Sequence, residues 1–303
     1  MKNILKHFFS LLLSGTLLGP ALADGPKVLI LMSDQNSIYR LIDQGIREKV
    51  SAEIVACKLQ DGEKEALAAV RSLKPDLVIA VGNAAALWAH AEITGVPLLA
   101  SGVIHQSNPA VFSKMPGVSL DCSLQSYFNL IRELAPAKGK VGLVIGANHP
   151  PEFKRRLAEL AEKASLKIRI VEVKKVNEVS EAVERVFRDG SEVFLMTYDP
   201  LIMNPESFKY LVDFSISNNL YLVAPSRALL KGGALASLEA DYLDIGRRTA
   251  EIANSILKDS GLSSRLELEF PSKEEVSVNR KIANSLRVNI PPSVIKKAVY
   301  VQE

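Results

Sequence analysis

The sequence is poor in the residues and motifs on which common enzyme chemistries depend. Its 303 residues hold only two cysteines, Cys57 and Cys122, which excludes a zinc cluster built from thiolates. It contains no G-x-S-x-G turn for a nucleophilic serine, no G-x-x-x-x-G-K-S/T phosphate loop, and no G-x-G-x-x-G turn after the first apolar run. The three histidines beyond residue 23, His90, His105 and His149, are not spaced as metal ligands. We therefore expect no catalytic residue, no metal, no cofactor and no enzymatic activity.

An excess of charge of one sign is also lacking. Residues 1–23 place Lys2 and Lys6 before an apolar run and end in the small residues Ala21-Leu22-Ala23, the pattern of a secretory signal peptide. Removal of this segment leaves 35 cationic against 34 acidic residues, a net charge near +1. That balance excludes nucleic-acid binding driven by bulk charge. No later apolar run reaches the ~20 residues of a membrane span, so we expect a periplasmic protein.

The two cysteines leave alternatives open. Neither lies at the predicted cleavage site, so we expect a soluble form without a lipid anchor. An oxidising compartment permits a disulfide between Cys57 and Cys122. Two buried free thiols fit the sequence as well, because spacing alone does not bring two Cα atoms within bonding range.

Short apolar runs alternate with amphipathic stretches along most of the chain. This alternation predicts parallel sheets with helices on both faces. It occurs as two successive arrays, so the sequence predicts an α/β protein of two doubly wound parallel-sheet lobes. The predicted strands are 27–32, 53–59, 77–81, 97–101, 141–145, 167–173, 193–198 and 221–224. The predicted helices are 37–50, 62–73, 84–93, 123–134, 151–163, 178–188, 204–218 and 242–258.

Polar turns follow many of the predicted strands. The carboxyl ends of the strands are where open α/β sheets bind ligands. In one hypothesis the Gly82–Ala85 turn holds a carboxylate at a helix start while Asp199 or Glu239 pairs with an ammonium, which would select a zwitterion. The alternative is that Gly82 only forms the turn and Asn83 caps the helix. The candidate ligand-binding residues are Gln35, Asn36, Gly82, Asn83, Ala84, His105, Gln106, Ser119, Asp121, Asn148, Tyr198, Asp199, Ser226 and Glu239.

Four segments resemble the substrate-binding proteins of ABC transporters, specifically the group of tryptophan- and tyrosine-type binding proteins with the type I periplasmic-binding-protein fold. The resemblance covers nearly all of the chain beyond residue 23. The segments are Pro75–Ala85, Gly117–Ser119 with Leu134-Ala135-Pro136, Gly233–Ser237 with Asp241-Tyr242 and Gly246, and Val278–Leu286 before Ile290-Pro291-Pro292.

The resemblance implies a hinge of several short crossings near residues 139, 232 and 264. Lobe 1 would then comprise 24–139 and 233–264, and lobe 2 would comprise 140–232 and 265–303. It also implies an ABC permease of the inner membrane as partner. The chain has Asn83 where the family usually has threonine, and Asn108-Pro109 after an inserted His105-Gln106 where the family has Asp-Pro. These positions resemble ligand-facing loops, so the ligand can differ from the family's aromatic amino acids.

The sequence thus predicts a monomer that captures a small polar molecule between its lobes and hands it to an ABC importer. The expected ligand is an amino acid, aromatic ones included, or a related zwitterion. Two rival functions remain at this point: a sensor subunit that presents its ligand to a membrane receptor, and a secreted α/β hydrolase or sugar-modifying enzyme. The missing nucleophile and metal motifs argue against the enzyme.

Overall fold

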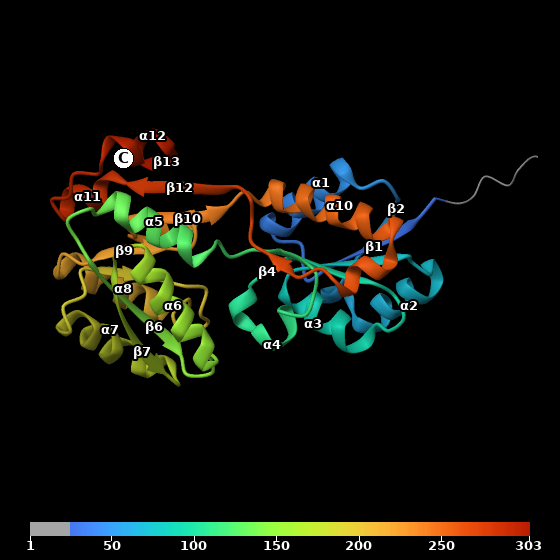
Figure 1. Ribbon diagram of the computed structural model, residues 1–303, viewed down its shortest axis with the longest axis horizontal. Helices are drawn as coiled ribbons and strands as arrows, with labels where there is room; N and C mark the ends of the chain where they lie inside the picture. The colour runs from blue at the N-terminus through green and yellow to red at the C-terminus, as the bar shows by residue number, and fades with distance from the viewer. Residues whose placement is uncertain (1–24) are drawn as a thin grey trace, which may run out of the picture.

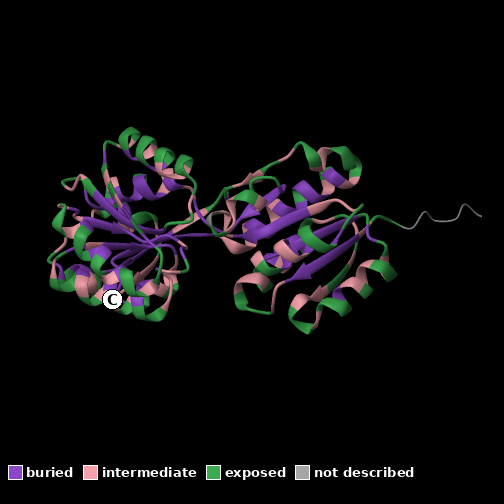
Figure 2. Cartoon of the chain, turned by 90° about the horizontal axis from the view of Figure 1, so that it is seen from below, coloured by how far each residue is buried: buried purple, intermediate pink, exposed green. Residues whose placement is uncertain are grey.

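The computed structural model describes residues 25–303, and the predicted signal peptide, 1–23, lies outside them. The chain forms two α/β lobes joined by a narrow waist (Figure 1). Buried residues fill the central strands of both sheets, and exposed residues cover the outer helices (Figure 2). The predicted fold class, two parallel-dominated α/β lobes, is therefore confirmed.

The first lobe is built on six parallel strands in the order β11-β5-β4-β3-β1-β2. These are β1 Lys27–Met32, β2 Glu53–Lys58, β3 Leu77–Val81, β4 Leu98–Val103, β5 Gly117–Ser119 and β11 Leu268–Glu269. Its helices are α1 Ser37–Lys49, α2 Glu63–Leu73, α3 Asn83–Glu92, α4 Pro109–Phe112 and α10 Tyr242–Lys258.

Successive residues of β1 face opposite sides of this sheet. Val28 and Ile30 pack in the core formed with α1 and α10, whereas Leu29 and Leu31 pack in the core formed with α2 and α3. The sequence of a strand that is buried on both faces is one continuous apolar run. The run KVLILM therefore predicted β1 correctly.

Two glycines let α1 and α10 pack with their backbones in close contact. A Cβ on Gly45 would lie 2.2 Å from the carbonyl oxygen of Leu243, and one on Gly246 would lie 2.1 Å from that of Ile42. Neither position has room for a larger side chain without moving a helix. The pair therefore fixes α10 to lobe 1, although α10 is far from α1 in the sequence.

The second lobe has seven strands in the order β13-β12-β10-β9-β8-β6-β7, and only the β10–β12 pair is antiparallel. The strands are β6 Lys140–Gly146, β7 Lys167–Val173, β8 Val193–Leu195, β9 Tyr221–Ala224, β10 Ala236–Ala240, β12 Glu274–Asn279 and β13 Ala298–Gln302. The helices are α5 Leu124–Leu134, α6 Pro151–Lys163, α7 Val179–Arg188, α8 Pro205–Ser217, α9 Arg227–Gly232, α11 Arg280–Ser285 and α12 Pro292–Lys297. Short 3₁₀ turns occur at η1 Leu59–Asp61, η2 His105–Ser107, η3 Val176–Glu178 and η4 Ser260–Ser264.

The chain changes lobe at three points that differ from the predicted ones. The first crossing follows β5 and leads to α5, which packs on α6 and α12 of lobe 2. The second lies at Asp241 between β10 and α10, and the third joins β11 to β12 through residues 270–273. The predicted crossings near 139, 232 and 264 are therefore corrected. The crossings implied by the resemblance placed α5, β10 and β11 in the wrong lobe, and the local strand–helix alternation could not correct this because it does not show which sheet a strand joins.

Several local predictions also change. β8 ends at Leu195 rather than at 198, and residues 227–232 form the unpredicted helix α9.

The two cysteines lie apart: Cys57 is on the edge strand β2 and Cys122 is in the first crossing. Both are free thiols, so the disulfide alternative is not realised. Burial raises the pKa of both thiols. Among residues 25–303, no helix is both long and apolar enough to cross a membrane.

Candidate functional site

A cavity of about 370 Å³ lies where the two lobes meet. Lobe 1 contributes η2 and the end of β5, lobe 2 contributes the beginning of α6, and the third crossing forms a further wall. The volume is within the ~300–1,000 Å³ range of small-molecule sites. The lining residues are His105, Ser113, Ser119, Asp121, Leu124, Phe153, Arg156, Glu267, Leu268, Glu269 and Phe270.

Asp121 is the most unusual group in this cavity. Its residue is 3% exposed, and its Oδ1 accepts a hydrogen bond of 3.0 Å from the amide of His105. The other carboxylate oxygen, Oδ2, is buried and has no hydrogen-bond partner among the described residues. Burial raises the pKa of Asp121 to about 6, against the opposing effect of the His105 amide. A buried oxygen without a donor favours binding of a cation that supplies one.

Ser119 and η2 hold this carboxylate in place. The Ser119 hydroxyl donates to the backbone carbonyl of Asp121 over 3.0 Å. Asn83 fixes η2 through two bonds, since its Oδ1 accepts from the Ile104 amide at 2.7 Å and its Nδ2 donates to the Ser107 hydroxyl at 2.5 Å. Asn83 thus positions the segment whose His105 amide contacts Asp121.

Arg156 supplies the positive charge of the cavity. It lies on α6, in the second turn of the helix, and its residue is exposed. Among the described residues it forms no ion pair, whereas its neighbour Arg155 lies 3.7 Å from Glu159. The pKa of His105 is lowered first by burial and then by the Arg156 charge, which places this guanidinium near η2. Lobe 2 therefore brings a cation toward the lobe 1 side of the cavity.

Two aromatic rings line the same space. Phe153 stacks on His149 with ring centroids 4.5 Å apart, which fixes the ring at the beginning of α6. Phe270, in the third crossing, is 41% exposed and is one of few large apolar side chains so exposed among the described residues. An exposed aromatic ring in a cavity is a contact surface for an apolar ligand group.

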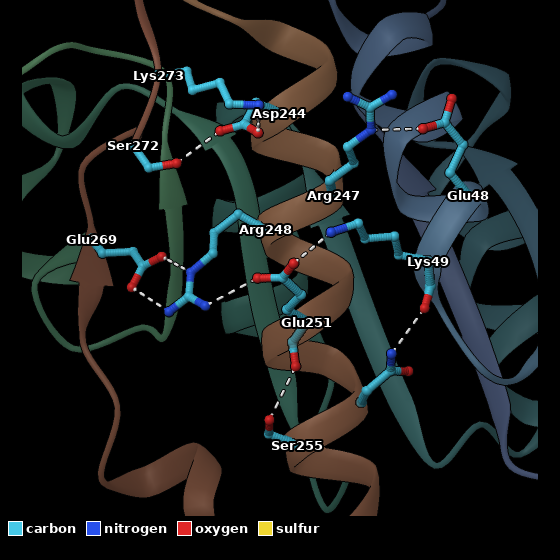
Figure 3. Close-up of polar contacts among 11 residues, drawn as sticks. Glu48, Lys49, Asp244, Arg247, Arg248, Glu251, Ser255, Glu269, Ser272 and Lys273 are labelled. Atoms are coloured by element: carbon cyan, nitrogen blue, oxygen red, sulfur yellow. Dashed lines mark hydrogen bonds and ion pairs between the residues drawn. The ribbon is translucent and has the colours of Figure 1, made fainter.

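The third crossing is fastened to α10 on both sides of Phe270 (Figure 3). On one side the Glu269 carboxylate accepts from Arg248, whose Nη2 lies 3.1 Å from Oε2. On the other side Ser272 donates to Asp244 over 2.7 Å, and Lys273 lies 2.9 Å from the same carboxylate. These contacts anchor the segment that carries Phe270 to lobe 1.

In the predicted carboxylate site at Gly82–Ala85, the chain itself already uses one of the backbone amides. The Ser33 hydroxyl accepts from the Ala85 amide at 2.9 Å and so caps α3, a role predicted for Asn83. Gly82 has a φ of 85°, and a Cβ there would lie 2.4 Å from the Tyr39 ring. Glycine is therefore needed for the turn itself. Ala84 is exposed beside it.

Asp199 and Glu239, the predicted partners of an ammonium, already have donors. Asp199 accepts from the amides of Gly146 at 2.6 Å and Leu201 at 2.9 Å, and its Oδ2 lies 3.3 Å from His149 Nε2. Burial alone would raise the pKa of Asp199, but the hydrogen bonds from His149 and the two amides outweigh this effect and lower the pKa below its usual value. Glu239 Oε2 accepts hydrogen bonds from the Arg227 amide at 3.0 Å and from the Tyr242 hydroxyl at 3.1 Å, and Glu239 Oε1 forms an ion pair with Arg227 Nε at 3.0 Å.

The other candidates are dispersed over several loops and do not line the interlobe cavity. Asn36 caps α1 by accepting from the Tyr39 amide at 3.0 Å, and Tyr198 donates to the Pro225 carbonyl at 2.9 Å. Asn148 lines a separate cavity of about 510 Å³ with Asp199. Gln35 is exposed before α1, Ser226 precedes α9 without capping it, and the side chain of Gln106 lies outside the described part of the chain. Of the fourteen candidates, His105, Ser119 and Asp121 line the interlobe cavity together.

Sequence reasoning missed Phe153, Arg156 and Phe270. The first two lie in the opening turns of α6, directly after the polar turn that ends β6. Their signal in the sequence is their position within the first two helical turns after a polar turn that follows a predicted strand. Phe270 had no such signal, because the sequence did not show that residues 270–273 form a crossing. Among residues 25–303, no group of three or more His, Cys, Asp or Glu side chains is placed to hold a metal ion.

Two parallel-sheet lobes, three crossings and a cavity between them define a protein of the type I periplasmic-binding fold. Residues 37–302 match the family described as ABC transporter substrate binding protein, and the chain belongs to this family. The family resemblance of the sequence is thereby confirmed. No curated protein matches the chain.

Solved structures share the same architecture. An ABC domain from Streptococcus pneumonia in complex with L-Trp is 22% identical with a TM-score of 0.62, covering 91% of this chain and 99% of that one. A conserved domain protein from Vibrio cholerae is 18% identical with a TM-score of 0.64, covering 92% and 100%. The ligand-free, open structure of a substrate-binding protein from Clostridium difficile is 18% identical with a TM-score of 0.71, covering 91% and 99%. Identities this low establish the fold alone.

Proposed function

We propose that this protein captures a small zwitterion, an amino acid or a close relative, between its lobes and delivers it unchanged to an ABC importer. The observation that carries this proposal is the interlobe cavity, whose walls come from lobe 1, lobe 2 and a crossing. A ligand in such a cavity contacts both lobes at once. Its binding therefore favours the arrangement in which the lobes lie close together.

The energy required for closure is modest. Shifting a two-state equilibrium from 1:99 to 99:1 takes about 5.5 kcal/mol of preference for the closed state. Charge-assisted hydrogen bonds contribute roughly 1.5–3 kcal/mol each, so a few of them on a zwitterion are sufficient. A neutral molecule would need more contacts to give the same preference.

The setting of this function follows from the sequence and the family. The N-terminal pattern Lys2, Lys6 and Ala21-Leu22-Ala23 supports export, and family membership supports a membrane permease as the partner. We propose that the protein acts in the periplasm as a monomer, with the closed form read by the permease. Chemical conversion of the ligand has no place in this scheme.

Thermal unfolding with a ligand panel tests the proposal. The panel contains the twenty L-amino acids, and its comparison set contains sugars, polyols and nucleosides. A ligand at a hundred times its Kd stabilises by about 2.7 kcal/mol, so one or a few amino acids should raise the Tm by several degrees. Small-angle scattering with the same compound should show a smaller radius of gyration, and mass spectrometry should recover it unaltered. Binding without compaction, or release of a product, would contradict the proposal.

A further inference from the structure

We propose that Asp121 and Arg156 are the two poles of an amino-acid clamp, in which Asp121 Oδ2 accepts the α-ammonium and Arg156 binds the α-carboxylate. Phe153 and Phe270 then contact an apolar or aromatic side chain. This inference rests on the proposed function and specifies the chemistry of the same cavity. It replaces the Gly82–Ala85 turn, Asp199 and Glu239 as the charged contacts of the ligand.

Asp121 is suited to an ammonium because its environment leaves one oxygen unused. Oδ1 is held by the His105 amide at 3.0 Å, so the carboxylate cannot rotate freely. Oδ2 is buried, has no donor among the described residues, and belongs to a residue that lines the cavity. The fold thus maintains a desolvated acceptor in a fixed orientation, as preorganised ligand sites do.

Arg156 is suited to a carboxylate for the complementary reason. Its guanidinium has a fork of donors that matches two carboxylate oxygens, and it forms no ion pair within the described chain. It comes from lobe 2, whereas Asp121 lies where the chain leaves lobe 1. A zwitterion that joins the two poles therefore draws the lobes together, while a molecule with one charge engages only one side.

The remaining walls define what the rest of the ligand looks like. Phe153, Leu124 and Phe270 present apolar surface, and Phe153 is held by its stack on His149. Glu269 is neutralised by Arg248 (Figure 3), which leaves Glu267 as a further, exposed carboxylate. A ligand with one ammonium, one carboxylate and an apolar side chain satisfies Asp121, Arg156 and the rings together. A diamine held by Asp121 and Glu267 would be the competing chemistry.

Titration calorimetry with matched probe sets tests the clamp. Each set contains an amino acid, its deaminated acid and its decarboxylated amine: L-phenylalanine with 3-phenylpropanoate and phenethylamine, and the corresponding sets for L-tyrosine, L-tryptophan and L-leucine. Putrescine, glucose and adenosine represent other chemistries. We expect at least one amino acid to bind, and its two analogues to bind roughly 10- to 150-fold more weakly, since each lacks one charge-assisted contact.

Two variants assign the poles. Asp121→Asn should weaken the amino acid roughly 10- to 150-fold but leave the deaminated acid within about twofold, because that acid has no ammonium to lose. Arg156→Gln should likewise weaken the amino acid roughly 10- to 150-fold but leave the decarboxylated amine within about twofold, because that amine has no carboxylate to lose. Asp213→Asn, on the exposed face of α8, and Arg155→Gln, beside Arg156 on α6, are controls that should bind like the unmodified protein. Circular dichroism melting confirms that each variant is folded.

The outcomes separate this inference from the proposed function. If an amino acid binds equally well to Asp121→Asn or to Arg156→Gln, the assignment of that pole is wrong. If putrescine, glucose or adenosine binds and no amino acid does, the zwitterion clamp is wrong while solute binding stands. If no probe of any class binds, and extracts of the producing cells give no bound compound by native mass spectrometry, the proposed function itself fails.

Discussion

Asp121 and Asp199 are both buried aspartates that lie just beyond the carboxyl end of a strand, yet they have opposite environments. Asp199 receives two backbone amides and the His149 ring, and its pKa is lowered despite burial. Asp121 receives one amide, and burial raises its pKa to about 6. The same residue type at the same kind of position therefore serves structure in lobe 2 and remains available for a ligand in the cavity.

The two carboxylates differ in their hydrogen-bond donors, because both oxygens of Asp199 have one whereas Asp121 Oδ2 has none among the described residues. A buried carboxylate that is fully hydrogen-bonded contributes to the free energy of folding, whereas an unpaired one costs free energy until a cation arrives. Proteins place such costs at functional sites and offset them elsewhere in the fold. Four experiments test the roles of these two aspartates and of the cavity around Asp121, and they follow in order of decreasing expected effect.

The largest effect is expected for Asp199→Ala. The change leaves the amides of Gly146 and Leu201 without an acceptor and His149 without its partner, so the free energy of unfolding should fall by about 3–5 kcal/mol. Because the pKa of Asp199 is lowered in the folded state, this stabilisation is present at neutral pH and is lost as the pH falls through that lowered value. Urea unfolding at pH 7.5 measures it, and a loss below 1 kcal/mol would contradict the structural role.

Asp121→Asn should have the opposite sign. The pKa of Asp121 is raised from 3.8 to about 6, so the native protein loses stability from this group as the pH rises from about 4 through about 6. The variant lacks that loss, and we expect it to be more stable by about 1–3 kcal/mol at pH 7.5 and nearly unchanged at pH 4. Urea unfolding at both pH values tests this. A variant that is less stable at pH 7.5 would show that the carboxylate is structural.

Ligand affinity should depend on pH through the same group. An amino acid keeps one ammonium and one carboxylate between pH 5 and 7.5, whereas Asp121 is largely protonated at pH 5. Binding should therefore weaken about tenfold from pH 7.5 to pH 5. Calorimetry at both pH values measures this change in affinity, and Asp121→Asn should show no such dependence. A variant that keeps the full dependence would assign it to another group.

The other titratable or charged groups near Asp121 are His105, Cys122, Tyr127, Arg156, Tyr198, Glu239, Glu267, Glu269 and Glu274.

The smallest effect is expected for Arg248→Gln. Its ion pairs with Glu269 and Glu251 are solvent-exposed, so the free energy of unfolding should change by less than about 1 kcal/mol. The change frees one side of the segment that carries Phe270, and we expect amino-acid affinity to fall a few-fold. Arg265→Gln, which breaks the exposed pair with Asp259, is the matched control and should not alter affinity. Equal affinity in both variants would show that the anchoring in Figure 3 does not shape the cavity.

The sequence predicted the fold better than it predicted the site. Runs such as KVLILM at 27–32 report burial on both faces directly, so the eight strands predicted from such runs all occur in the structure in that order, whereas short strands such as β5 and β11 were not predicted. The lobe to which α5, β10 and β11 belong depends on pairing across the waist, which a local pattern does not contain. This is the physical reason for the misplaced crossings.

Within the site, Ser119 and Asp121 were selected as polar loop residues although β5, which ends at Ser119, was not predicted, and both line the cavity. The sequence could not rank Asp121 above Asp199, because the rank depends on which backbone amides point at each carboxylate. Nor could it assign Asn83, whose side chain fixes η2 across the sheet edge. The selected polar residues differ in whether their polar atoms already form hydrogen bonds within the fold, and the sequence does not show this.

Nuclear magnetic resonance titration of the Asp121 side-chain carboxyl carbon, with and without the amino acid that binds, measures whether a ligand ammonium reaches this carboxylate. We expect a pKa of about 6 in the free protein and a value at least one unit lower in the complex, because an ammonium at Oδ2 favours the ionised form. A pKa that is the same in both states, with the amino acid bound, would contradict the assignment of Asp121 to the ammonium.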